Sequence, residues 1–139
     1  MTTSVVLDSW AILLYLRSEG PTAAAVEDLL AADAPIVSWI NLGEVFYILR
    51  RRVGDAEAQR TIRDLQAVTT PELPTAGRVL QAARIKADYP LSYADAFAAA
   101  TAVAHHATLW TGDPELLITG APWTWRDLRP RPIGVESTE

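Results

Sequence analysis

The sequence predicts an α/β domain in which a mainly parallel sheet of four to five strands is flanked by helices. Short apolar runs rich in β-branched residues alternate with longer segments of helical periodicity, which is the pattern of parallel α/β folds. Half of the 139 residues are hydrophobic and 21% are charged, as in ordinary globular proteins. No internal repeat or linker interrupts the pattern. We therefore expect a single domain over residues 1–139, in which about residues 129–139 form a partly ordered tail.

The first half of the chain is expected to form two buried strands and four helices. Apolar runs predict strands at 4–7 and 36–38. Helical spacing of apolar residues predicts helices at 10–17, from 22 onward, at 39–53 and at 55–66. Ser9 and Thr22 are candidate N-caps, Gly20 and Pro21 are expected to stop the first helix, and Gly54 is expected to end the third.

The second half is expected to contain the remaining strands and three further helices. A third strand is predicted at 68–70, before a break at Pro71, and a helix at 75–87. Ser92 begins an alanine-rich helix, and a strand at 109–111 follows it. A short helix at 114–118 and an edge strand at 123–125 complete the expected elements.

Composition limits the possible chemistry and location of the protein. The chain has no cysteine, which excludes disulfides and thiolate metal sites. It shows no signal-peptide pattern and no apolar stretch close to the ~18 residues of a membrane span, so we expect a cytoplasmic protein. The net charge of −5 argues against a nucleic-acid binder that relies on a broad basic face. Eleven of the twelve basic residues are arginine, which suits phosphate contacts, although codon bias is the simpler explanation.

Four acidic residues are the candidate functional residues: Asp8, Glu44, Asp95 and Asp113. Each has a structural explanation on its own; Asp95, for example, can form a capping box with Ser92. Together they lie where a parallel sheet would direct side chains to the edge at which ligands bind. Clustered carboxylates repel each other unless a cation lies among them. Carboxylate ligands favour Mg²⁺ or Mn²⁺ over zinc, and such ions promote phosphodiester hydrolysis.

Four stretches of the sequence form a known set of motifs. They are Val5–Ser9 around Asp8, the third-helix position of Glu44, Leu91–Ala96 around Asp95, and Leu109–Leu116 around Asp113. In these residues, and in its length and order of elements, the sequence resembles PIN-domain ribonucleases. The resemblance is strongest to the VapC-type toxins of bacterial toxin–antitoxin pairs, and it implies a PIN-like three-layer fold.

The resemblance also implies a function and a set of partners. The chain would be a metal-dependent endoribonuclease, the toxin of a type II toxin–antitoxin system, that hydrolyses RNA phosphodiesters with a metal-activated water. The four acids would be catalytic and would bind Mg²⁺ or Mn²⁺, with Ser9 and Thr111 beside them. The implied partners are an RNA substrate, a VapB-like antitoxin and a second copy in a homodimer, with no membrane.

Other residues are weaker candidates. Arg50, Arg51 and Arg84 could contact RNA phosphates, although solvated helix faces explain them as well. Trp10 is bulkier than the resemblance leads us to expect after Asp-Ser, and we interpret it as part of the core. His105 and His106 end a helix, where a protonated imidazole favours the helix dipole, so we expect a structural role.

Two other functions remain open from the sequence. A phosphoacceptor receiver domain is also α/β with acids near strand ends. It would need an acidic pair beside Asp8 and a lysine after a late strand, whereas the one lysine, Lys86, falls within a predicted helix. A catalytically inactive PIN-like interaction scaffold would share the fold, and the complete set of four acids argues against it.

Overall fold

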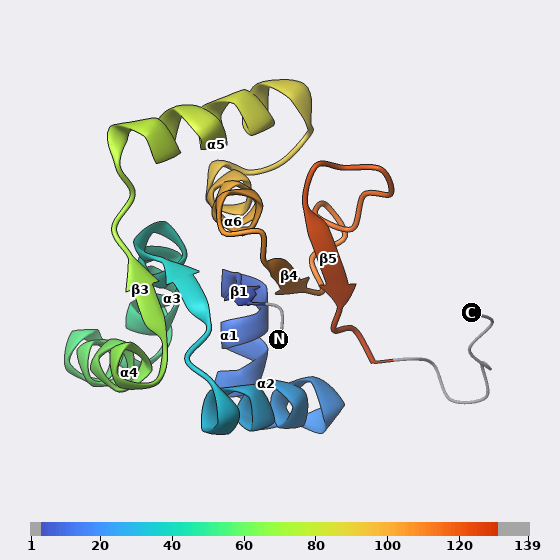
Figure 1. Cartoon of the computed structure of the whole chain (residues 1–139). Coiled ribbons are helices and arrows are strands. Elements are labelled where there is room, and N and C mark those ends of the chain that lie inside the picture. Colours follow the sequence, from blue (N-terminus) through green and yellow to red (C-terminus); the bar gives the residue numbers. More distant parts are fainter. Residues whose placement is uncertain (1–3, 131–139) are drawn as a thin grey trace.

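The computed structural model, which describes residues 4–130, contains a five-stranded sheet in which every neighbouring pair is parallel (Figure 1). The sheet order is β3-β2-β1-β4-β5. The strands are β1 (Val5–Leu7), β2 (Ile36–Ser38), β3 (Thr70–Glu72), β4 (Thr108–Thr111) and β5 (Thr124–Asp127). The predicted α/β class and parallel sheet are confirmed.

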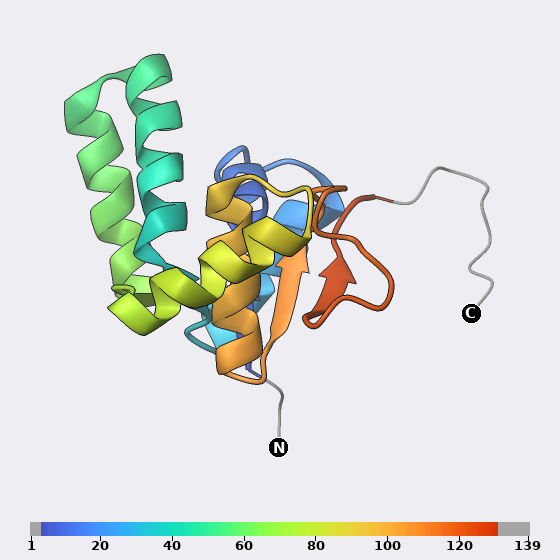
Figure 2. The same cartoon turned by 90° about the horizontal axis from the view of Figure 1, so that it is seen from above.

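The helices form layers on both faces of this sheet. They are α1 (Ser9–Leu16), α2 (Gly20–Ala32), α3 (Trp39–Val53), α4 (Asp55–Val68), α5 (Ala76–Asp88) and α6 (Tyr93–Ala104). Successive residues of a strand point to opposite faces, so Val6 enters the core beneath α5 and α6, and Leu7 enters the core beneath α1 to α4. Figure 1 shows α5 and α6 on one side of the sheet and α1 and α2 on the other. Figure 2 shows α3 and α4 side by side, extending away from the rest of the molecule.

The strand order decides one of the open alternatives. Receiver domains of the flavodoxin-like type have the order 2-1-3-4-5, in which β3 lies beside β1. Here β4 pairs with β1, and β3 is an edge strand beyond β2. The receiver interpretation is therefore wrong. Lys86 lies in α5, where its ammonium group donates to the Leu91 carbonyl at 2.7 Å.

Two boundaries near the N-terminus differ from those expected. Gly20 and Pro21 open α2 instead of stopping α1, because proline suits the first turn of a helix, where its missing N–H is not needed. Thr22 is not an N-cap; its hydroxyl donates to the Leu128 carbonyl far along the chain. The N-cap of α1 is Asp8, not Ser9: its carboxylate accepts from the Ala11 N–H at 2.8 Å.

Two expected elements in the second half also differ from the structure. The third strand is Thr70–Glu72, not 68–70, because α4 continues to Val68 and the strand includes Pro71. An edge strand tolerates proline because one side of its backbone has no strand to pair with. Residues 114–116 form a turn rather than the start of a helix, with the Leu116 N–H donating to the Asp113 carbonyl at 3.0 Å, and residues 117 and 118 have no regular structure.

The predicted tail lies mostly at 131–139, outside the described residues. Within residues 4–130, none of the helices has the length and apolar character needed to cross a bilayer.

Trp10 packs against the end of β4. Its indole ring is half-buried, and a Cβ atom built on Gly112 would lie only 2.2 Å from a ring carbon. Because Gly112 has no side chain, the Trp10 ring in the first turn of α1 can lie directly against the backbone at Gly112. The interpretation of Trp10 as a packing residue is supported, since it lies against the core of α1 to α4.

We predict that Gly112→Ala lowers the free energy of unfolding by about 1–3 kcal/mol, because the new methyl group overpacks the Trp10 ring. Thermal melting of Gly43→Ala provides the control. Gly43 lies in α3 with open space around its Cβ position, so alanine there should stabilise the protein by about 0.5–1 kcal/mol. Adding Trp10→Leu to Gly112→Ala should recover part of the loss; strictly additive effects would contradict the contact.

Candidate functional site

Asp8 is the most buried acid of the molecule's described part. It follows β1 directly and is 0% exposed. One carboxylate oxygen accepts from the Ala11 N–H at 2.8 Å, and the other accepts from the Thr111 hydroxyl. The register of the sheet explains the second contact, because Leu7 pairs with Trp110 and the next residues along the two strands are Asp8 and Thr111.

Burial raises the pKa of the Asp8 carboxyl to about 7. The hydrogen bonds from Thr111 and Ala11 oppose this shift, and repulsion from Asp113 and Glu44 adds to it. Asp113 and Glu44 therefore lie near enough to Asp8 for their charges to act on its carboxyl. Glu44 lies in the second turn of α3 and is half-buried.

Asp95 lies in the first turn of α6 and is 7% exposed. Burial raises the pKa of its carboxyl above its usual range, and the Asp113 carboxyl beside it raises this pKa further. Only half of the expected capping box forms. The Ser92 hydroxyl accepts from the Asp95 N–H at 3.2 Å, but the Ser92 N–H donates to Glu115, at 3.4 Å, and not to Asp95. The Asp95 carboxylate is directed to other acids instead of closing its own helix turn.

Three carboxylates come closest together: those of Asp95, Asp113 and Glu115. One oxygen from each lies within 4.8 Å of the others. Asp113 is held by two local bonds, since its N–H donates to the Thr111 hydroxyl at 3.0 Å and its carboxylate accepts from the Glu115 N–H at 3.0 Å. The Thr111 hydroxyl thus links the Asp8 carboxylate to the backbone of Asp113.

The sequence did not identify Glu115 or Asn41 as site residues. The only signal for Glu115 is its place two residues after Asp113, in a segment that was expected to be helical. The tight turn directs its exposed side chain back toward Ser92. The Ser9 hydroxyl donates to the Asn41 backbone carbonyl at 3.2 Å, whereas the Asp8 carboxylate accepts from Ala11 and Thr111.

The candidate RNA-binding arginines lie in three different settings. Arg50 forms an ion pair with Asp55 at 3.0 Å, where α3 meets α4. The guanidinium carbon of Arg51 lies 4.9 Å from the centre of the Tyr47 ring, and this exposed pair is on the same stripe of α3 as Glu44. Arg84 lines a cavity between α5 and α6, with Ile85 and Val103.

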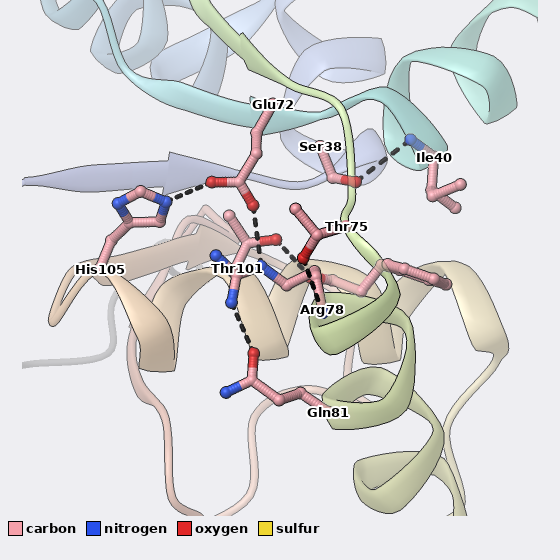
Figure 3. Close-up of polar contacts among 9 residues, drawn as sticks. Ser38, Ile40, Glu72, Thr75, Arg78, Gln81, Thr101 and His105 are labelled. Carbon is pink, nitrogen blue, oxygen red and sulfur yellow. Dashed lines mark hydrogen bonds and ion pairs between the residues drawn. The ribbon is translucent and has the colours of Figure 1, made fainter.

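The adjacent histidines are not part of the acidic cluster. His105 ends α6 and forms a hydrogen bond with Glu72, which also accepts from Arg78 at 2.8 Å (Figure 3). Burial alone would raise the pKa of the Glu72 carboxyl, but the hydrogen bonds from Arg78 and His105 outweigh it and lower this pKa. The expected structural role of His105 is supported, because this cluster joins β3 to α5 and α6.

The donor set fits a hard divalent cation. The cluster offers only carboxylate oxygens, which suit Mg²⁺ and Mn²⁺. Burial and, to a smaller extent, the neighbouring acids raise the pKa of Asp8 and of Asp95, so their ionisation costs free energy that a nearby cation would offset.

We predict that the metal-free protein becomes less stable as the pH rises from about 4 to about 7. The folded-state pKa of Asp8 is about 7 and its ordinary value is 3.8, so folded protein holds a proton that unfolded protein releases. The stability that this bound proton provides is fully present below the unfolded-state pKa of 3.8 and is lost as the pH rises past the folded-state pKa of about 7. Thermal melting in EDTA at several pH values measures it, and Asp8→Asn should flatten the dependence. Asp28→Asn, an exposed change on α2, should leave the slope unchanged.

Comparison with known proteins places the chain in a family. The model of the PIN domain family matches residues 5–120. No curated protein sequence matches the chain. Solved structures with the same fold include toxins from VapBC toxin–antitoxin complexes.

Three of these structures show the extent of the similarity. A DNA-bound VapBC from Salmonella typhimurium has a TM-score of 0.75 at 13% identity, over 92% of this chain and 100% of its own. VapBC2 from Rickettsia felis, bound to a promoter DNA fragment, has a TM-score of 0.71 at 14% identity, over 88% and 97% of the two chains. VapC20 from Mycobacterium tuberculosis, a toxin that cleaves the sarcin–ricin loop, has a TM-score of 0.67 at 19% identity, over 81% and 92%. Since the family model covers most of the sequence and these structures share its fold, the chain belongs to the PIN domain family.

Proposed function

We propose that the protein is a metal-dependent endoribonuclease and the toxin of a type II toxin–antitoxin pair. The observation that supports this most directly is the convergence of acids from four separate segments at the carboxyl edge of the sheet in a PIN fold. Structural capping would explain one such acid at a time. It does not explain why the pKa values of two of them are raised by burial and, in addition, by neighbouring acids.

The carboxylates of Asp95, Asp113 and Glu115 would hold a Mg²⁺ or Mn²⁺ ion, with Asp8 and Glu44 adjoining it. Such an ion lowers the pKa of a water molecule and stabilises the charge that develops on a phosphate. Thr111 orients one oxygen of Asp8 and the backbone of Asp113, so it fixes the acids relative to each other. Water attacks the phosphorus, the bond to the 3′ oxygen breaks, and that oxygen takes up a proton. The products carry 5′-phosphate and 3′-hydroxyl ends.

RNA is the proposed substrate. VapC20, whose fold this chain shares, is a toxin that cleaves the sarcin–ricin loop. Among the arginines, Arg51 is the best placed for a phosphate, because the Tyr47–Arg51 pair follows Glu44 along one exposed stripe of α3. An exposed tyrosine ring at this position suits stacking of an unpaired base.

An antitoxin is the proposed protein partner. Related toxins were solved in VapBC complexes, two of them on DNA. A cavity of about 280 Å³ between α1 and α2 is the proposed seat of a partner helix; its walls are both apolar, from Leu16, Ala23 and Ala24, and polar, from Ser18 and Glu27. A homodimer remains part of the proposal and is tested by measuring the mass of the free toxin in solution.

We predict that the purified protein, free of antitoxin, cleaves RNA with Mg²⁺ or Mn²⁺ and stops with EDTA. Asp8→Asn and Asp95→Asn should remove cleavage, whereas Asp28→Asn should retain it. End-labelling of the fragments distinguishes mechanisms: 2′,3′-cyclic phosphate ends would rule out attack by water. Arg51→Ala should raise KM, whereas Arg84→Ala should not. Equal cleavage by wild type and both site variants would favour an inactive scaffold with a contaminating nuclease.

We predict that Mn²⁺ stabilises the wild-type protein by about 1.4 kcal/mol at ten times its dissociation constant. The corresponding rise in melting temperature is a few degrees for a domain of this size. Glu115→Gln and Asp95→Asn should each reduce the rise, because each removes a charge from the cluster. Glu57→Gln, on the exposed face of α4, is the matched control and should keep the full rise. An equal rise in all four proteins would show that Mn²⁺ binds elsewhere.

A further inference from the structure

We infer that Asn41 is a positioning residue whose buried side-chain amide fixes the spacing of the helix starts that bear the proposed metal-binding acids. This inference rests on the proposed function and concerns a residue that is not itself among those acids. Asn41 is 0% exposed and lies in the first turn of α3, one turn before Glu44.

The Asn41 side chain connects three helices. Its Nδ2 donates to the Ala94 carbonyl at 3.0 Å, in the first turn of α6, and to the Ser9 hydroxyl at 3.3 Å, in the first turn of α1. The Ser9 hydroxyl donates back to the Asn41 backbone carbonyl at 3.2 Å. Ser9 follows Asp8 in the chain and Ala94 precedes Asp95, so each bond adjoins an acid.

The partners fix the orientation of the amide. A carbonyl oxygen can only accept, so the Asn41 atom that faces Ala94 must be the nitrogen. The Ser9 hydroxyl already uses its hydrogen on the Asn41 backbone and therefore meets the same nitrogen with a lone pair. Exchanging Oδ1 and Nδ2 would place Oδ1 against the Ala94 carbonyl and lose that bond.

The Oδ1 atom of Asn41 is a free acceptor. It is the one buried side-chain nitrogen or oxygen without a hydrogen-bond partner among residues 4–130. Buried amide oxygens are nearly always paired, and unpaired ones concentrate where a protein has a task other than stability. This unpaired oxygen belongs to the side chain whose nitrogen binds Ser9 and Ala94, the chain neighbours of Asp8 and Asp95.

The repulsion between the acids explains why their spacing needs a fixed link. One oxygen from each of Asp95, Asp113 and Glu115 lies within 4.8 Å of the others, and ionised carboxylates at this separation repel each other. The two Nδ2 bonds oppose the separation of α1 and α6. Without them the same ligands remain, but they are no longer held at the spacing that an ion needs.

The experiment compares metal affinity with stability in the full-length protein. The dissociation constant of Mn²⁺ is measured from the EPR signal of free Mn²⁺, and the melting temperature is measured in EDTA. Asn41→Ala should weaken Mn²⁺ binding by about tenfold or more, the range found when groups that orient metal ligands are removed. Ser9→Ala should weaken it less, because the bond to Ala94 remains; this mild truncation also serves if Asn41→Ala does not fold.

Thr101→Ala is the matched control. Thr101 is equally buried, at 0% exposure, but its hydroxyl donates to the Phe97 carbonyl within α6 at 2.7 Å and joins no other element. It should lower the melting temperature and leave the Mn²⁺ affinity unchanged. Wild-type affinity in Asn41→Ala or Ser9→Ala, despite a lower melting temperature, would overturn the inference while leaving the proposed function intact. A wild type that bound no Mn²⁺ and cleaved no RNA would overturn both.

Discussion

The repulsion among buried carboxylates at one edge of the sheet is the constraint on which the arrangement of the molecule depends. Asp8 is held there by the Ala11 N–H and the Thr111 hydroxyl, and Asp95 lies at the start of α6, where helix N–H groups and the dipole favour negative charge. These contacts favour the ionised carboxylates, but both pKa values stay raised, chiefly through burial and in part through the neighbouring acids. The fold must therefore keep α1 and α6 in place by packing elsewhere.

The packing of α6 provides much of this restraint. Every residue from Asp95 to Ala102 is buried, and five of these eight are alanine. Small side chains allow the helix to approach the sheet and α5 closely, which places Asp95 beside the ends of β1 and β4. The parallel register then brings Thr111 level with Asp8. The alanine run and the acidic site are thus two parts of one arrangement.

The sequence was sufficient for the fold class, for the order of most elements and for the expectation that Asp95 and Asp113 lie close together. The strong signals were local: apolar runs for β1 and β2, helical periodicity for α3, and Ser92 as the cap of α6. It was insufficient where tertiary context overrides local preference, as at Pro71, which an edge strand accommodates, and at Pro21, which begins a helix. Asn41 and Glu115 were missed as site residues because their contacts with Ala94 and Ser92 join segments distant in sequence.

The geometry separates the acids into two groups, and this division assigns them different tasks in the proposed enzyme. Asp95, Asp113 and Glu115 offer oxygens close enough to share one ion, whereas Glu44 acts on Asp8 from the side of α3. Glu115 is exposed and lies in a turn, so its carboxylate can adjust to an ion at little cost in packing. Asp8 is fully buried and held by two hydrogen bonds, so it cannot adjust. The rigid Asp8, directly after β1, therefore sets the position of the site, and the adjustable Glu115, after β4, completes it.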